Sequence, residues 1–171
     1  MATQLDALLI AISIYSRIKN ALDLSTSLDT IQRNKTWSFT DGAGLDQADV
    51  VWSDERTLGA SGDENLDLSG VLTDAFGTVI TFVRIKAIYL EADLANTNDV
   101  WLGGAAANIF ATPFAGGSGV VSIPPNGALL MVAPGATAWV VTAGTADQLR
   151  VRNSAGGTSV KYRIMLVGSL T

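Results

Sequence analysis

The sequence predicts a mainly β protein, an antiparallel β-sandwich of the jelly-roll type with an N-terminal helical arm. Two observations predict the sandwich. Apolar and polar residues alternate along short stretches through most of the chain, and clusters of Gly, Pro, Asn and Asp separate these stretches at intervals of about 8 to 12 residues. Helical spacing of apolar residues near the N-terminus predicts the arm. We therefore expect a helix with its connector over residues 1–35 and a sandwich domain over 36–171.

Residues 4–23 are expected to form the helix. Their apolar side chains recur every three or four positions, at Leu5, Leu8, Leu9, Ile12, Tyr15, Ile18 and Leu22. Two interpretations stay open: the helix packs on its own sandwich, or it docks on another subunit. The polar stretch 24–35, LSTSLDTIQRNK, is expected to be a connector.

The apolar run ALLIAISIY at residues 7–15 predicts no targeting or membrane segment. No positive charge precedes it, and Asp6 lies at its start. It is also shorter than the roughly 20 residues that a membrane-spanning helix needs.

Strands are expected from Trp37 onward. In the first half they cover 37–39, 50–58, 66–72 and 78–91, and in the second half 100–102, 119–123, 128–132, 138–142, 148–153 and 159–168. In the last strand, Val160, Tyr162, Ile164 and Leu166 should face the core, and Lys161 and Arg163 should face solvent. In the same way Val83, Ile85, Ala87 and Tyr89 should share one face, and Arg84, Lys86 and Ile88 the other.

The composition indicates a protein that works by contact with other chains. Of the 171 residues, 48% are apolar and only 16% are charged, whereas a typical soluble domain has about 25% charged residues. Partner chains are therefore expected to cover part of the surface. The net charge of −5 and the pI near 4.5 argue against a nucleic-acid partner, which requires a basic surface.

The chain contains no histidine and no cysteine. Catalysis by a serine or cysteine nucleophile normally needs a histidine base, and zinc sites normally use Cys or His ligands. No cofactor motif is present either, because the glycine-rich stretches are not followed by a lysine and a helix. We expect a protein that is not an enzyme and holds no cofactor.

Weaker hypotheses for chemistry remain. A hydrolase could use two carboxylates alone, and the candidates are Asp54 with Glu55 and Asp63 with Glu64. Calcium could bind acidic loops, either at Asp41, Asp46 and Asp49 or at Asn96, Asn98 and Asp99. Neighbouring acids on a strand point to opposite faces, and acids in loops are usually solvated. Turn formation explains the two calcium candidates more simply. The four tryptophans, Trp37, Trp52, Trp101 and Trp139, could stack on sugars, but core packing or a subunit contact is the simpler use.

Five blocks of the sequence carry a resemblance. They are DGAG…QADVVWSDERTL (41–58), LDLSGVLTDAFG (66–77), FVRIKAIYLEA (82–92), NTNDVWLGGAAAN (96–108) and the stretch from PPNGALLMVAPG to YRIMLVG (124–168). Over residues 36–168 the chain resembles small virion proteins of tailed bacteriophages, among them capsid decoration (cement) proteins and other head or tail accessory proteins. The resemblance lies in the residue pattern of these blocks and includes no active-site motif.

The resemblance implies a protein on the outer surface of the phage head. Such a protein binds the major capsid protein, associates with itself, typically as a trimer, and stabilises the junctions between capsomers; no membrane or nucleic acid is involved. The expected contact residues are Leu5, Leu8, Leu9, Ile12 and Tyr15 of the arm, and Trp101, Phe110 and Phe114 near the loop 103–118. The alternative is a tail, fibre or vertex accessory protein that binds host surface glycans.

Overall fold

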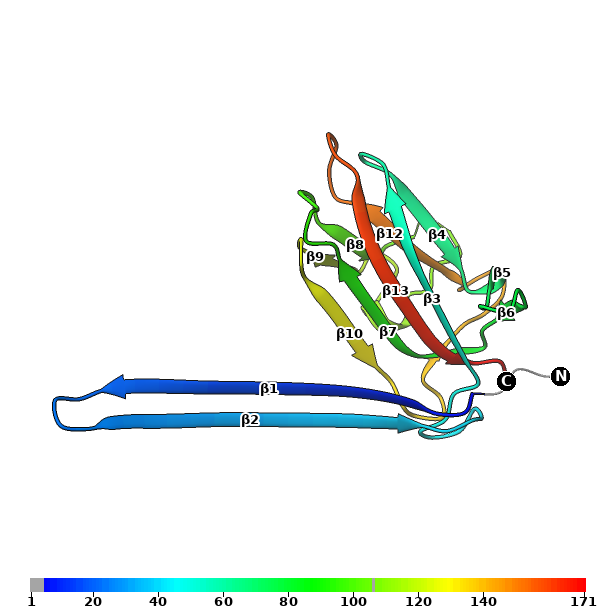
Figure 1. The fold of residues 1–171 in the computed structure, drawn as a ribbon. Helices are drawn as coiled ribbons and strands as arrows, with labels where there is room; N and C mark the ends of the chain where they lie inside the picture. Colours follow the sequence, from blue (N-terminus) through cyan, green and yellow to red (C-terminus); the bar gives the residue numbers. More distant parts are fainter. Residues whose placement is uncertain (1–4, 106) are drawn as a thin grey trace.

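A computed structural model describes residues 5–105 and 107–171 of the chain. Two antiparallel sheets face each other in a β-sandwich, from one end of which a long hairpin projects (Figure 1). One sheet has the order β10 (Ala128–Val132), β7 (Arg84–Ala92), β13 (Val160–Ser169), β3 (Val50–Leu58), with β11 (Trp139–Val140) also paired to β7. The other has the order β4 (Asp63–Asp67), β12 (Gln148–Asn153), β8 (Val100–Gly103), β9 (Val120–Ile123). The mainly β, antiparallel prediction is confirmed.

Both sheets contribute to one apolar core. Ile88 and Leu90 of β7 and Leu102 of β8 have no exposed surface, and they belong to the same buried cluster as Leu149 and Val151 of β12. The predicted faces of the last strand are confirmed: Val160, Tyr162, Ile164 and Leu166 are buried, while Lys161 and Arg163 lie on the outer face.

The predicted strand bounds match those of β3, β10 and β12, but two longer predicted strands are each divided. Residues 66–72 span the end of β4 and most of β5 (Ser69–Thr73), and residues 78–91 span β6 (Val79–Thr81) and most of β7. The division arises because the chain changes hydrogen-bonding partners. Phe82 N donates to Leu68 O at 2.9 Å, and Val83 N donates to Ser169 O at 2.8 Å. The strands β5 and β6 then pair with each other at one end of the sandwich.

The expected N-terminal helix and its connector are wrong. Residues 8–39 form a β-hairpin of two 14-residue strands, β1 (Leu8–Ala21) and β2 (Thr26–Phe39), paired from Leu8↔Phe39 to Ala21↔Thr26. Apolar residues at Leu8, Ile10, Ile12, Ile14 and Ile18 fit a period of two as well as a helical period. The β-branched isoleucines favour the strand, and the polar stretch 24–35 supplies its partner. β2 also continues past residue 36, where the sandwich domain was expected to begin.

A bulge in β7 explains why the expected alternation fails there. Ala87 lies opposite Val167, and Ile85 lies opposite Gly168, so Lys86 is the extra residue. The inward face therefore changes at this point: Ile85, Ile88 and Leu90 belong to the main core, whereas Ala87 belongs to a second apolar cluster. The prediction that Ile85, Ala87 and Tyr89 share a face is wrong.

Helical structure in the described part of the chain is confined to a single 3-10 turn, η1 (Thr112–Phe114). No helix among these residues has the length or apolar character needed to cross a membrane.

Candidate interaction surface

The root of the hairpin is packed firmly on the sandwich. Leu8 pairs with Phe39 and Ile10 with Trp37, which places all four side chains on the same face of the hairpin. Phe39 is buried in the second apolar cluster, against which the other three pack. Ala87 of β7 and Val167 of β13 complete this cluster. The root is thus fixed to the sheet that contains β10, β7, β13 and β3, which we call the front sheet.

Lys86 holds the loops beside this root. Its side chain is fully buried, and Nζ donates hydrogen bonds to Ala43 O at 3.2 Å, Gly44 O at 3.0 Å and Gly135 O at 2.6 Å. Ala43 and Gly44 lie in the loop that follows β2. Burial lowers the pKa of Lys86, while the three carbonyl oxygens favour the protonated amine. One side chain therefore ties the loop after the hairpin to the loop after β10.

Beyond the root, the hairpin has no support from the sandwich in the described structure (Figure 1). We call residues 12–35 the arm. Its apolar face carries Ile12, Ile14, Ile18 and Ile31, together with the charged residues Asp29, Arg33 and Lys35, because these residues share the face of the root side chains. Ile14 and Ile18 are each 59% exposed. An isolated two-stranded hairpin is at best marginally stable in water, so a partner is expected to cover this face.

The opposite face of the arm is mostly polar. Ser13 Oγ donates to Asn34 Oδ1 at 2.8 Å, and the neighbouring positions carry Thr30, Gln32 and Arg17. Apolar residues on this face are separated along the hairpin: Leu9, Tyr15 and Leu28, all exposed. The hairpin is therefore amphipathic, and its two faces differ chemically.

A hollow of about 420 Å³ lies at the end of the sandwich that carries β5 and β6. Its lining includes Val50, Phe76, Val79, Ile80 and Leu170, and three carboxylates, Asp6, Asp49 and Asp74. Phe76 is 80% exposed and Val79 56% exposed. Both side chains are thus available for contact with another molecule.

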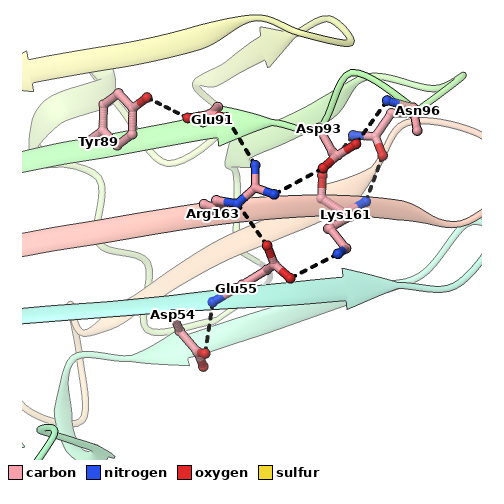
Figure 2. Close-up of polar contacts among 9 residues, drawn as sticks. Asp54, Glu55, Tyr89, Glu91, Asp93, Asn96, Lys161 and Arg163 are labelled. Atoms are coloured by element: carbon pink, nitrogen blue, oxygen red, sulfur yellow. Dashed lines mark hydrogen bonds and ion pairs between the residues drawn. The ribbon is translucent and has the colours of Figure 1, made fainter.

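Charged side chains cover the outer face of the front sheet near its far end (Figure 2). Arg163 on β13 contacts Glu55 at 2.8 Å, Glu91 at 3.1 Å and Asp93 at 3.2 Å, and Lys161 contacts Glu55 at 2.9 Å. The hydrogen bond from Lys161 lowers the pKa of Glu55, and the charge of Glu55 raises the pKa of Arg163. The charged groups on this face are thus paired with one another, whereas the isoleucines on the apolar face of the arm are left exposed.

The four carboxylates considered for hydrolysis are all held in ion pairs. Glu55 and Asp54 lie on opposite faces of β3, and Asp54 contacts Arg56 at 3.0 Å. Asp63 contacts Arg150 at 2.9 Å. Glu64 contacts Arg56 at 2.5 Å and accepts a hydrogen bond from the Tyr162 hydroxyl at 2.5 Å. Burial and the Glu64 carboxylate raise the pKa of Tyr162 well above its ordinary range.

Several polar side chains in the loops considered for calcium form hydrogen bonds within the protein. Asp41 Oδ1 accepts a hydrogen bond from Leu5 N at 3.3 Å, and Asp49 Oδ2 accepts one from Leu170 N at 3.0 Å. Asn98 Nδ2 donates to Asn153 Oδ1 at 2.9 Å. Within residues 5–105 and 107–171, no group of three or more acidic side chains is arranged to hold a metal ion.

The structure places the expected contact residues in different environments. Leu5 and Leu8 pack at the root, and Ile12 is half-buried on the apolar face of the arm. Leu9 and Tyr15 are exposed on the opposite face of the hairpin. The Trp101 ring is half-buried beneath the Arg152 guanidinium, 4.3 Å from the ring centroid. Phe110 is buried in the core and Phe114 packs against it, so Phe110 cannot be an exposed anchor.

Ile31 and Arg33 are two candidate contact residues that the sequence pattern did not predict. Both lie in the stretch assigned to a connector, yet Ile31 is 45% exposed on the apolar face of the arm. The signal available in the sequence was the period-two spacing of Ile10, Ile12 and Ile14, followed by turn-forming residues at 23–25. In the structure Leu22 N donates to Ser25 O at 2.8 Å across this turn.

Neither a comparison with protein-family models nor one with curated proteins finds a match to this chain.

Proposed function

We propose that this chain is a bacteriophage capsid decoration (cement) protein. As a homotrimer it binds the major capsid protein on the outer surface of the head and stabilises the junctions between capsomers. The observation that carries the proposal is the arm, a hairpin whose apolar face is left open beside a rigid sandwich. A protein that joins neighbouring subunits needs such a projecting contact.

The strand order supports a jelly roll as the finer description of the sandwich. β3 pairs with β13, β4 with β12, β7 with β10 and β8 with β9. These four antiparallel pairs are those of a long ribbon rolled into two four-stranded sheets. Jelly rolls of this kind occur in viral capsid proteins and in lectins, so the fold is compatible with both candidate functions.

The environment of the tryptophans weighs against the glycan-binding alternative. Trp52 lies in the core, Trp139 packs against it, Trp37 packs at the root, and Arg152 covers the ring of Trp101. A sugar platform needs an open aromatic face. The cement function therefore has the stronger support.

The first test is the copy number of the chain in purified virions, measured by quantitative mass spectrometry against the major capsid protein. A decoration protein should be present in numbers comparable to the capsid protein. A few copies per particle would point to the tail or a vertex, and absence from the particle would refute both functions.

The second test is binding to heads that lack the chain. A shortened-arm variant, in which Ile12 is joined to Lys35 through an Asn-Gly turn, retains the root pairs Leu8↔Phe39 and Ile10↔Trp37. We expect the full chain to sediment with heads and the shortened-arm variant to remain in solution. Equal binding of the two proteins would show that the arm is not needed for binding to heads.

A further inference from the structure

The hollow at the β5–β6 end is lined by apolar side chains and carboxylates, a combination that suits a segment with apolar and cationic side chains. Its floor is formed by Val50, Val79, Ile80 and Leu170, with Phe76 exposed at its edge. Exposed apolar side chains gathered in a concave site indicate a binding surface.

Fixed negative charges surround these apolar side chains. Asp74 Oδ1 accepts hydrogen bonds from Phe76 N and Thr78 N, both at 2.8 Å, and Asp49 Oδ2 accepts one from Leu170 N. Asp6 adds a third carboxylate, and no lysine or arginine is among the lining residues. An occupant with isoleucines and a nearby cation would satisfy both the apolar floor and the acidic edge.

The arm has these properties. Its apolar face presents Ile14, Ile18 and Ile31. The same face carries two cations, Arg33 and Lys35, and one carboxylate, Asp29, so it keeps a net positive charge. Four cations and two carboxylates give the hairpin, residues 8–39, a net charge of +2. Residues 40–171 contain seven cations and thirteen carboxylates, a net charge of −6. Hairpin and sandwich are thus oppositely charged.

The arm cannot reach the hollow of its own chain. It leaves the root and projects away from the end that carries β5 and β6 (Figure 1). Its strands of 14 residues extend roughly 45 Å at about 3.3 Å per residue. The distal isoleucines are therefore remote from their own hollow and available to a second molecule.

We propose that the arm of one copy docks, with its apolar face inward, in the hollow of a second copy. This inference rests on the proposed function, in which the arm serves assembly, and it names the surface that receives the arm. Asp6 lies next to the root of the receiving copy's own hairpin, so each docked arm would also contact its neighbour's root. The contact is head-to-tail, and contacts of this type close into rings such as trimers or continue as open chains.

Engineered cysteines test the contact cleanly because the chain has none of its own. One tagged preparation carries Ile18→Cys on the apolar face of the arm, and an untagged one carries Val79→Cys in the hollow. After the two are mixed and treated with a short bis-maleimide, we expect a heterodimer of tagged and untagged chains.

Matched controls define the geometry. Thr30→Cys lies on the opposite face of the same arm, and Val120→Cys on β9 is exposed but outside the hollow. Ile18→Cys with Val120→Cys, and Thr30→Cys with Val79→Cys, should each give at least several-fold less heterodimer. Equal yields in all pairings, no product, or products only between two Ile18→Cys chains would overturn the proposal; the last would show arm-to-arm pairing.

Charge reversal gives an independent measurement on the same contact. Arg33→Glu on the apolar face should weaken self-association at least tenfold in analytical ultracentrifugation, whereas Arg17→Glu, an identical change on the opposite face, should alter it little. Equal effects of the two variants would overturn the proposal. Both experiments use the purified chain without heads, so their outcome is separate from the head-binding test of the proposed function.

Discussion

Lys86 Nζ donates a hydrogen bond to Gly135 O at 2.6 Å, and the same amine reaches Ala43 O and Gly44 O. This amine is buried without a carboxylate among its hydrogen-bond partners in the described structure, so its positive charge is satisfied by carbonyl dipoles. It lies in the bulge of β7, beside the root of the hairpin. The loop that follows the hairpin is thus held by a side chain that belongs to the sandwich.

Replacing Lys86 with Met should destabilise the protein. The methionine fills similar space but leaves three carbonyl oxygens without their donor, which outweighs the relief of burying a charge. We expect a loss of about 1–3 kcal/mol in the free energy of unfolding, measured by urea denaturation. Hydrogen exchange in residues 41–48 should also accelerate. The control is Lys161→Met, which removes an exposed ion pair and should cost less than about 1 kcal/mol.

The root and the arm should respond differently to truncation of an isoleucine. Ile10→Ala removes a side chain packed in the second apolar cluster and should cost about 2–3 kcal/mol. Ile14→Ala removes one that is 59% exposed and should change the stability of the isolated chain by less than about 0.5 kcal/mol. Thermal denaturation of both variants measures the difference. Similar losses would mean that the arm is already covered in the free protein.

The strands of the sandwich could be predicted from the sequence because they follow from local patterns. The alternation of Val160, Tyr162, Ile164 and Leu166 and the turn at 74–77 follow from side-chain period and turn chemistry. The prediction failed where the structure of a segment depends on pairing with a segment distant in the sequence. Whether Ile10, Ile12 and Ile14 belong to a helix or a strand depends on pairing with residues 26–39. Which side chains of β7 face the core depends on the bulge at Lys86. The hollow could not be foreseen, because it joins Asp6, Asp74 and Leu170.

Acid should weaken the charged face of the front sheet. The hydrogen bond from Lys161 lowers the pKa of Glu55, and the backbone amide of Ala95 lowers the pKa of Asp93. A carboxylate with a depressed pKa contributes stability above its ordinary value and loses it as the pH falls through its value in the folded protein. The free energy of unfolding should therefore decline as the pH falls below about 4.5, the ordinary pKa of Glu55. Glu55→Gln should reduce this slope, and an unchanged slope would show that the ion pairs add nothing.

Tyr162 should control stability at the opposite end of the pH scale. Its hydroxyl donates to Glu64, and burial together with that carboxylate raises its pKa above the ordinary value of 10. The folded chain then keeps a proton that the unfolded chain releases, so the free energy of unfolding should fall as the pH rises above 10. Tyr162→Phe should cost about 1–2 kcal/mol at pH 7 through the lost hydrogen bond.

The same variant should be less sensitive to alkali, because the group that titrates is gone. Urea denaturation of both proteins from pH 7 to pH 11 makes the comparison, and their stabilities should converge as the pH rises. Tyr89 is the matched control, since it also donates to a carboxylate, at 2.8 Å to Glu91, but lies on the outer face. Tyr89→Phe should cost less at pH 7 than Tyr162→Phe. Parallel pH profiles for the Tyr162→Phe variant and the unmodified chain would show that Tyr162 does not carry the alkaline transition.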